Sequence, residues 1–454
     1  MRFIKRTLPL LATICLSCGE NFLDIKSNQR QKVPNSIADY QSMMDQTSYI
    51  NVSGHVLGMI GSDEYFINTG QYDAFRQGTN YNYQKNAYTW EKEVYEGGED
   101  ALLDWNNGYR IVLRANIVLS GLEKIESASD DLTSYNTARG TALFHRAMTW
   151  YNLAQLYCPV YDAENADIEL GLPLRTDPDV TTPSDWSSLE DTYRKIITDM
   201  QLAKTLLPQV PLTKFRPGKI AVDAFLARMY LQMGEFSFAK NHADQVLSAT
   251  STLIDFNELT NTDNHSFPVD GSGNPEVIYF SRLSDILILS PTYFNADTLL
   301  LESYEDGDLR KTYYFKENAS ERELFMGSYS GDKYYFTGLA TDEVFLIKAE
   351  CEARLGDTGA ALAALNRLRK HRLSTDQYVA LESQDISEVL DLVIAERRKE
   401  LVMRGTRWED IRRLNKEERY ETALVRQLGD RRIELLPGSD RFIWSLPLEV
   451  ITPE

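Results

Sequence analysis

The feature that most constrains the fold of this 454-residue chain is the recurrence of apolar residues at three- and four-residue steps. The segments "WNNGYRIVLRANIVLSGLEKI" (residues 105–125) and "ALFHRAMTWYNLAQLY" (residues 142–157) each carry such a stripe, which is typical of amphipathic helices. Pro159 ends the second pattern. A third helix is predicted to begin with Ser187 as its N-cap and to end at Pro208. Long helices therefore dominate the predicted fold.

Two later helical pairs share one spacing of small residues. Small side chains allow two antiparallel helices to approach closely, and a glycine between them permits a tight turn, as in tetratricopeptide-type repeats. Tyr230 also matches the aromatic position of that repeat, whereas Glu352 does not. The repeated positions are Ala227, Gly234 and Ala239 in the first pair, and Ala349, Gly356 and Ala361 in the second. We predict a mostly α fold with a tetratricopeptide-like scaffold that the other helices complete.

Two long irregular segments interrupt the helices, at residues 51–98 (the first excursion) and residues 251–338 (the second excursion). Both are rich in polar and aromatic residues, and the second contains the β-like runs "EVIYFSR", "KTYYFKE" and "DKYYFTG". The last two runs are predicted to pair as a hairpin across the polar stretch that begins at Asn318. Because long excursions from a scaffold often carry function, these segments are the first place to look for a site.

The N-terminus has the layout of a secretory signal. Basic residues precede an apolar stretch from Leu8 to Leu16, which is too short for the roughly 20 residues of a membrane span. Ser17 and Cys18 then resemble the end of a bacterial lipoprotein signal, in which Cys18 is lipidated and becomes the new N-terminus, although Cys15 stands where such signals usually carry Leu. The alternative is an ordinary secreted protein cut nearby. We predict a signal peptide over residues 1–17 and a lipid anchor on Cys18.

Charge and cysteine content exclude several classes of protein. With 48 basic and 67 acidic residues, the net charge is −19, which argues against nucleic acid as a partner because such binding depends on neutralising phosphates. The same charge argues against electrostatic attachment to a membrane, so a lipid would have to hold the protein there. Beyond the leader only Cys158 and Cys351 remain unmodified; a disulfide between them is possible, but two buried free thiols fit their apolar helical contexts better.

A search for reactive constellations finds no catalytic, metal or cofactor site. "GSYSG" has Tyr329 where a nucleophile elbow needs Ser, and "RPGKI" has Ile220 where a phosphate loop needs Ser or Thr. The five histidines are widely scattered, with no pair at helical ligand spacing. Aromatic residues are the positive signal: Tyr and Phe occupy eleven of the forty-four positions from 293 to 336, against 11% aromatic residues overall. Flat rings with polar tips suit sugar-like ligands, although many such rings serve only to fill small cores.

Several motifs in order resemble the SusD/RagB family, the surface nutrient-binding lipoproteins of Bacteroidetes. "CGENFLD" is similar to the family's lipidated start, and Trp105, Tyr109, Ala115 and Asn116 match its early helix. "RGTALFHRAMTWYNLAQLYCPV" resembles a family helix, with Cys158 replacing the usual Gly. The later matching blocks are "GKIAVDAFLARMYLQMGEFSFA", "DEVFLIKAECEARLGDTGAALAALNRLR", "IAERRKELVMRGTRWEDIRR", in which Arg404 stands where the family prefers Glu, and the closing "IWSLPLEVI".

The block "ERRKEL…RGTRWEDIRR" fits a structural role on its own residues. Glu396 and Arg397 sit on helical faces, Gly405 can end the helix and Trp408 can pack back on it. Arg407 and Asp410 can then form ion pairs that brace the joint. We therefore predict a structural rather than a catalytic role for this block.

The resemblance implies a function that breaks no bond. Family members act as a lid on a SusC-like TonB-dependent outer-membrane transporter, capture an oligosaccharide or a peptide, and deliver it. The family's ligand face is built from loops off the scaffold, so the ligand-binding residues are predicted in the two excursions. They are Trp90, Tyr81 and Tyr83 in the first, and Tyr293 and Phe294 in the second. The chain is accordingly predicted to be lipid-anchored in the outer membrane and exposed at the cell surface.

The predicted organisation after the signal peptide is an N-terminal region over residues 18–250 and a C-terminal region over residues 251–454. Glycan capture is the leading hypothesis, and a peptide-binding lid of the same fold is the close alternative. Two other classes stay open: a surface glycan hydrolase, which would release reducing sugar from a polysaccharide, and a structural repeat adaptor, which would hold another protein on its concave helical face.

Overall fold

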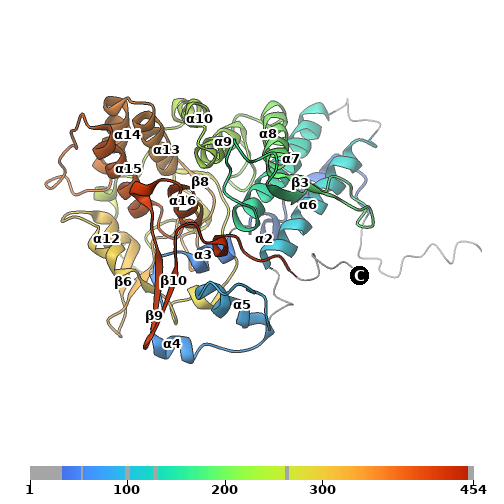
Figure 1. The fold of residues 1–454 in the computed structure, drawn as a ribbon. Helices are drawn as coiled ribbons and strands as arrows, with labels where there is room; N and C mark the ends of the chain where they lie inside the picture. Colours follow the sequence, from blue (N-terminus) through green and yellow to red (C-terminus); the bar gives the residue numbers. More distant parts are fainter. Residues whose placement is uncertain (1–32, 53–54, 98–102, 126–130, 261–264, 448–454) are drawn as a thin grey trace, which may run out of the picture.

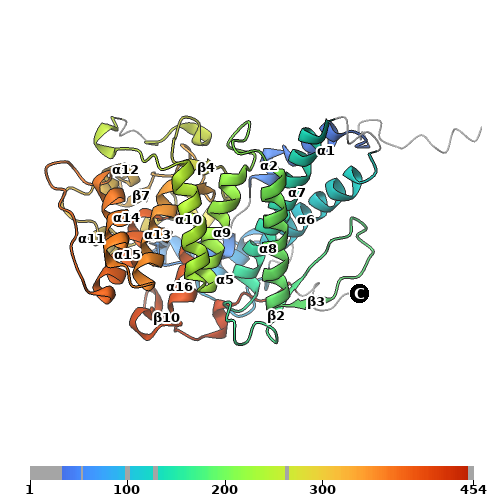
Figure 2. The ribbon, with the colours of Figure 1, turned by 90° about the horizontal axis from the view of Figure 1, so that it is seen from above.

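Helices packed side by side form the frame of the molecule (Figure 1). The computed structural model describes residues 33–447 except 53–54, 98–102, 126–130 and 261–264. Each long helix packs on the next one along the chain, from α6 to α10, and then α10 contacts α13, which contacts α14 and α15 (Figure 2). Their bounds are α6 (Leu103–Leu122), α7 (Leu132–Tyr157), α8 (Leu189–Leu206), α9 (Lys219–Met233), α10 (Phe236–Ala249), α13 (Thr341–Arg354), α14 (Thr358–Lys370) and α15 (Ile386–Glu400). The mostly α scaffold predicted from the sequence is confirmed.

The repeated glycines end the first helix of each pair as predicted. Gly234 has a φ of 78° and Gly356 a φ of 91°, a left-handed conformation that glycine adopts without the penalty of a Cβ. The alanines of the same pattern are all fully buried, which allows close contact between α9 and α10 and between α13 and α14. These alanines are Ala227, Ala239, Ala349 and Ala361.

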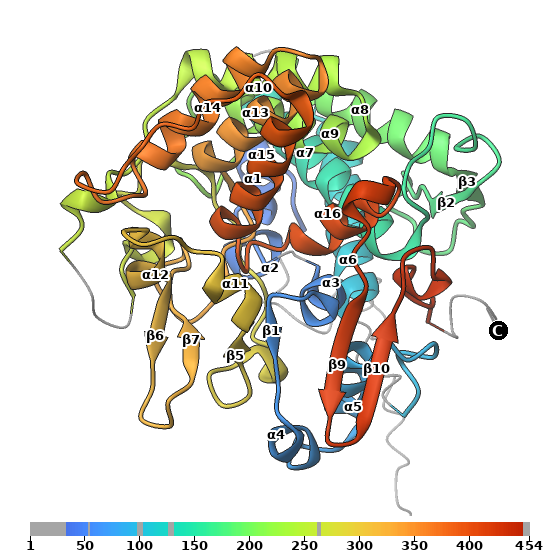
Figure 3. The same ribbon diagram turned by 60° about the vertical axis from the view of Figure 1, so that its left-hand side comes forward.

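Several short helices and strands lie on the other side of the molecule, as Figure 3 shows for α4, α5, β6 and β7, whereas α1 packs on α6 and α7 and the β2–β3 hairpin packs on α8. The short α-helices are α1 (Ile37–Met44), α2 (Thr47–Ile50), α3 (Val56–Gly61), α4 (Thr69–Asp73), α5 (Thr79–Tyr88), α11 (Thr298–Glu302), α12 (Leu309–Tyr314) and α16 (Arg407–Leu414). Single 3₁₀ turns cover Phe256–Glu258, Val269–Gly271, Leu287–Leu289, Glu418–Tyr420 and Asp440–Phe442.

In the described residues the strands form two-stranded antiparallel pairs rather than an extended sheet. β2 and β3 pair locally, as do β6 with β7 and β9 with β10, whereas β1 with β5 and β4 with β8 join distant segments. Their bounds are β1 (Tyr65–Phe66), β2 (Leu170–Pro173), β3 (Trp186–Ser188), β4 (Val277–Tyr279), β5 (Asn295–Ala296), β6 (Phe315–Glu317), β7 (Glu323–Phe325), β8 (Leu339–Ala340), β9 (Leu424–Leu428) and β10 (Arg431–Leu435).

Two local predictions need correction. The N-cap of α8 is Ser188 rather than Ser187: the Ser188 hydroxyl accepts a hydrogen bond from the backbone N–H of Asp191, whereas the Ser187 hydroxyl donates to the carbonyl of Leu172 across the β2–β3 hairpin. The predicted hairpin also has a different second strand. β6 does pair across the polar stretch at Asn318, but its partner is β7 rather than the run "DKYYFTG", which lies beyond the hairpin. The first four residues of the other predicted run, "KTYY", are helical in α12.

The structure also bears on the predictions for the cysteines and for membrane attachment. Cys158 and Cys351 are free and buried, as predicted, and burial raises the pKa of the Cys158 thiol to about 12. None of the helices in the described part of the chain is long and apolar enough to cross a membrane. The predicted lipidation site, Cys18, lies outside the described residues. The division of the chain at residues 250 and 251 stays a prediction.

Candidate functional site

The two excursions meet each other in the fold. β1 of the first excursion pairs with β5 of the second, with Tyr65 opposite Ala296 and Phe66 opposite Asn295. Figure 3 shows this pair between α4 and the β6–β7 hairpin. The Asn295 amide extends the join by donating to the Phe66 carbonyl and to the Gln71 side chain. Segments far apart in the sequence thus form one surface on the side opposite the helical scaffold.

Tyr81 and Tyr293, one from each excursion, lie against the same buried ring. Phe75 is almost fully buried, and it makes an edge contact with Tyr293 at 4.8 Å and with Tyr81 at 6.5 Å between ring centroids. Both tyrosines remain partly exposed. We call this group, together with Arg76, the tyrosine junction.

The tyrosine junction is positioned from both sides. Tyr81 lies in the first turn of α5, which begins after Gly78, a residue with a φ of 130°. The exposed Arg76 donates a hydrogen bond of 3.0 Å to the Tyr81 hydroxyl, and its guanidinium lies 5.3 Å from the centre of that ring. On the other side, Arg322 donates to the carbonyls of Pro291, Thr292 and Phe294, and so holds the loop that carries Tyr293. The rings are therefore fixed before any ligand arrives.

Three of the five predicted ligand-binding residues do not reach this surface. Trp90, Tyr83 and Phe294 are at most 2% exposed, so in this structure they cannot stack on a ligand. The Trp90 indole N–H donates to the Gly61 carbonyl at 3.0 Å, and Phe294 stacks on Tyr65 at 5.5 Å. Burial also raises the pKa of Tyr83 well above its usual value. The excursions need an aromatic core of their own, and these three rings supply it.

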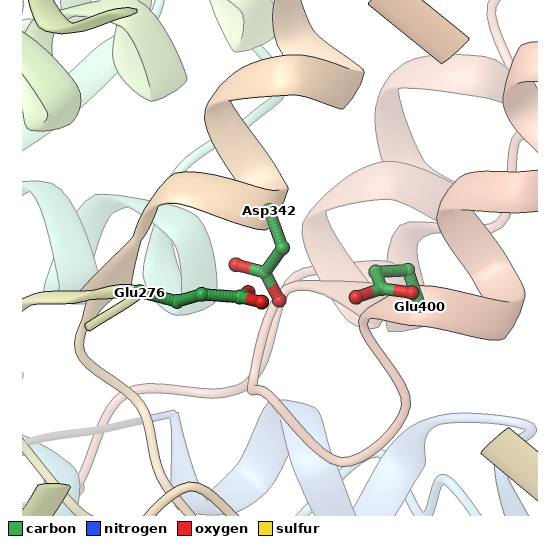
Figure 4. A group of neighbouring side chains, drawn as sticks. All are labelled: Glu276, Asp342 and Glu400. Atoms are coloured by element: carbon green, nitrogen blue, oxygen red, sulfur yellow. The ribbon is translucent and has the colours of Figure 1, made fainter. Parts of the chain in front are cut away.

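Three buried carboxylates in another part of the molecule lie close enough together to suggest a metal site. Figure 4 shows Glu276, next to β4, Asp342 in the first turn of α13 and Glu400 at the end of α15 pointing toward one another. One oxygen of each lies within 4.8 Å of the others, and all three residues are fully buried. Oxygen ligands of this kind suit hard divalent cations.

Arginines already satisfy these carboxylates. Arg372 bonds both oxygens of Glu276 at 2.9 Å and one oxygen of Glu400 at 2.8 Å. Arg310 takes the other oxygen of Glu400 at 2.8 Å, and Arg404 donates to Asp342 at 3.0 Å. A cation would have to displace these guanidinium groups, so the donor set does not fit a metal. We assign the cluster a structural role: it ties the second excursion to α13 and α15.

The block "ERRKEL…RGTRWEDIRR" has the structural role predicted for it. Gly405, with a φ of 80°, separates α15 from α16, and Trp408 is buried in a stack on Trp444 at 5.1 Å. Arg407 makes two bonds to Asp63 of the first excursion, at 2.7 and 2.8 Å. Burial alone would raise the pKa of Asp63, but the Arg407 guanidinium holds it well below its usual range. The block thus anchors the first excursion as the carboxylate cluster anchors the second.

Sequence reasoning did not anticipate a hollow between α6 and the β2–β3 hairpin. Its volume is about 730 Å³, and the rings of Trp105, Tyr109 and Trp186 line it. Trp105 and Tyr109 were matched only to a helix motif, and Trp186 stands in a loop-like stretch without periodicity. The one available signal was a tryptophan among polar residues, "PSDWSS".

Comparison with known proteins identifies relatives over most of the chain. A family model described as "Starch-binding associating with outer membrane" matches residues 21–231, and one described as "SusD family" matches residues 310–430. SusD-like protein P2 of Formosa agariphila is 25% identical over 371 residues, which are 68% of this chain and 71% of that protein. A SusD superfamily structure from Bacteroides fragilis aligns with a TM-score of 0.72 at 16% identity, covering 92% of this chain and 98% of that one. A laminarin-binding SusD-like protein aligns with a TM-score of 0.65 at 16% identity over 93% and 98%.

Proposed function

Because the chain belongs to the SusD/RagB family, we propose that it captures oligosaccharides at the cell surface through the tyrosine junction and delivers them to a transporter. One observation carries the proposal. Tyr81 and Tyr293, predicted separately from two excursions, lie against the same ring and stay partly exposed. The family model that matches residues 21–231 is one of starch-binding proteins, and one structural neighbour binds laminarin, which supports a glycan as the ligand.

The chemistry of the tyrosine junction fits a neutral glycan. A sugar ring presents an apolar C–H face that packs on an aromatic ring, while its hydroxyls need hydrogen-bonding partners at the ring's edge. Arg76 and the two tyrosine hydroxyls supply such partners beside the rings. The net charge of −19 disfavours an acidic polysaccharide as the ligand.

In this proposal the protein breaks no bond and needs no cofactor or metal. The protein binds the oligosaccharide and acts as the lid of a SusC-like TonB-dependent barrel in the outer membrane. The barrel transports the oligosaccharide. A lipid on Cys18 holds it to the membrane, because the acidic surface offers no electrostatic attachment.

The binding site is tested by isothermal titration with malto- and laminari-oligosaccharides. Tyr81→Ala and Tyr293→Ala are each expected to weaken the affinity for whichever series binds by tenfold or more, because each removes a stacking ring. Tyr49→Ala is the matched control, since Tyr49 is 61% exposed on α2 and belongs to neither excursion. Unchanged affinity in both junction variants would remove the tyrosine junction from the site, and binding to peptide pools instead of glycans would favour a peptide-binding lid.

The delivery step is tested by a gentle detergent pull-down of the tagged protein from its native outer membrane, followed by mass spectrometry. A large TonB-dependent barrel at near-equal amount is the expected result. Recovery of the lipidated protein alone would contradict the lid role, and steady release of reducing sugar from a bound polysaccharide would replace binding by hydrolysis.

A further inference from the structure

The hollow between α6 and the β2–β3 hairpin has the size and lining of a ligand pocket. Its volume of about 730 Å³ lies within the roughly 300–1,000 Å³ typical of small-molecule sites. In this hollow the ring centroids of Trp105 and Trp186 are 6.1 Å apart and their planes are tilted by 32° to each other. The ring centroid of Tyr109 lies 4.8 Å from that of Trp105. Figure 1 places α6 and β3 together at the end of the molecule away from α14 and α15. This hollow shares no lining residue with the tyrosine junction.

Trp186 differs from every other tryptophan of the chain. All six tryptophans lie among the described residues, and five of them are at most 6% exposed, whereas Trp186 is 37% exposed. Val180 on the same loop is 64% exposed. The hairpin thus leaves an indole and an aliphatic side chain in water at the rim of a hollow, although apolar surface lies within reach on α6. Single exposed apolar residues are common, but here the indole lies beside two more aromatic rings in one hollow, where a ligand could contact all three.

The loop that forms the rim, residues 174–185, is held in place by its own hydrogen bonds. The Arg175 guanidinium donates to the carbonyls of Val180 and Thr182 at 2.8 and 3.0 Å. Asn116 of α6 donates to the Arg175 carbonyl at 2.9 Å, and the Tyr109 hydroxyl donates to the Pro173 carbonyl at 3.0 Å. These bonds fix the distance between loop and helix. The hollow is therefore preorganised rather than a gap that collapses in solution.

The lining favours an uncharged ligand with one apolar face. Asn106, Arg110 and Ser184 place polar groups beside the rings, so the lining suits a ligand that has hydrogen-bonding groups as well as an apolar face. Charges of both signs line the same hollow, with Arg110 and Arg175 against Asp177, so a polycation is disfavoured and no strong excess of positive charge attracts a polyanion. A pyranose ring with hydroxyls at its edge satisfies both conditions.

We propose that this hollow is a second glycan site, in which a sugar ring stacks on Trp186. The ligand class is shared with the proposed function, but the site, the residues and the readout are separate. A long glycan held at both places dissociates more slowly than one held at the tyrosine junction alone, because the second contact is intramolecular. The second site thereby favours long chains over short ones.

The unmodified protein carries its own probe for this site. Because Trp186 is the one well-exposed tryptophan of the six, quenching of tryptophan fluorescence by acrylamide reports mainly on Trp186. Saturating malto- or laminari-hexaose is expected to reduce the quenching constant at least twofold, and to do so equally in a Tyr81→Ala, Tyr293→Ala double variant. Trp186→Ala should remove the second binding event from the calorimetric titration and keep the first.

Several outcomes would overturn the inference. Calorimetric binding of a hexaose without any change in quenching would place all bound sugar away from Trp186. Protection of Trp186 from quenching by peptides and not by sugars would show that the hollow binds peptides rather than glycans. If Trp186→Ala fails to fold, the quenching experiment on the unmodified chain still decides. Protection of Trp186 with unchanged affinity in the Tyr81 and Tyr293 variants would support the second site while removing the tyrosine junction, so the two proposals fail separately.

Discussion

In the helical pair α13–α14 two fully buried alanines, Ala349 and Ala361, belong to the shared core, whereas the excursions meet through whole rings such as Tyr65 on Phe294. Long helices satisfy their own backbone hydrogen bonds, so alanines at some positions suffice and leucines fill the rest of the interface. An excursion with strands of two or three residues has little regular structure to bury, so large side chains must supply its interior. Aromatic enrichment of a loop region is therefore first a sign of a local core and only second a sign of a ligand surface.

The two regions also differ in how they are attached to the rest of the molecule. Helices of the scaffold pack on their neighbours along the chain. The excursions are joined to the scaffold by ion pairs, Arg407 with Asp63 for the first, which is mostly buried, and Arg372 with Glu276 for the second, which is fully buried. Substitutions that break these ion pairs should therefore lower the free energy of unfolding more than substitutions on the surface of the scaffold helices.

The largest effect is expected for Arg372→Met. Arg372 is fully buried and bridges Glu276 and Glu400, so its loss takes the paired cation from the buried Glu276 carboxylate and leaves Glu400 with Arg310 alone. We expect the free energy of unfolding to fall by about 3–5 kcal/mol in urea denaturation. The matched control is Arg194→Met on α8, whose side chain is 63% exposed in pairs with Glu190 and Asp191 and should change stability by about 0.5 kcal/mol or less. Equal losses in both variants would contradict the role given to the cluster.

Trp90→Ala tests the first excursion's core. Its ring is fully buried, donates to Gly61 and lies 4.9 Å from the Arg426 guanidinium, so removal should cost about 3–4 kcal/mol by the same assay. Tyr81→Ala in the same excursion should cost about 1 kcal/mol or less and act on ligand affinity instead. A small stability loss at Trp90 together with a large loss of ligand affinity would restore Trp90 as a binding residue.

The scaffold was predictable and the tyrosine junction only in part, for a physical reason. Helical periodicity and the glycines Gly234 and Gly356 are local signals, which survive without knowledge of tertiary structure. Whether Trp90 or Tyr81 faces water depends on which distant segment covers it, and the Arg426 guanidinium that lies over Trp90 comes from β9, more than 300 residues along the chain. The hollow at Trp186 depends in the same way on where the β2–β3 hairpin lies against α6.

A smaller, pH-dependent effect is expected at Glu64 in the first excursion. Burial raises the pKa of Glu64 from 4.5 to about 7, and the neighbouring Asp63 carboxylate acts in the same direction, against hydrogen bonds from Met403 and Ser62. A raised carboxyl pKa adds stability that is full below pH 4.5 and is lost as the pH rises toward 7.

Glu64→Gln removes this titration, so the variant should gain about 2–3 kcal/mol relative to the unmodified protein between pH 4.5 and pH 7.5. Urea denaturation of both proteins across that range measures the difference. A constant difference at every pH would show that the pKa of Glu64 is the same in the folded and the unfolded protein.

The smallest effect separates two glycines three residues apart in the scaffold. A Cβ on Gly356 meets no atom within 4 Å, yet the φ of 91° is one that alanine adopts only with strain, so Gly356→Ala should cost about 1 kcal/mol. Gly359 lies within α14, and a Cβ there would meet only the Asp357 Oδ1 at 3.6 Å, an ordinary contact. Gly359→Ala should therefore stabilise the protein by about 0.5 kcal/mol, because alanine is the better helix former. Thermal denaturation measures the change in Tm of each variant. The two changes in Tm have opposite signs if the turn between α13 and α14 depends on its backbone angle, and the same sign if packing alone determines stability.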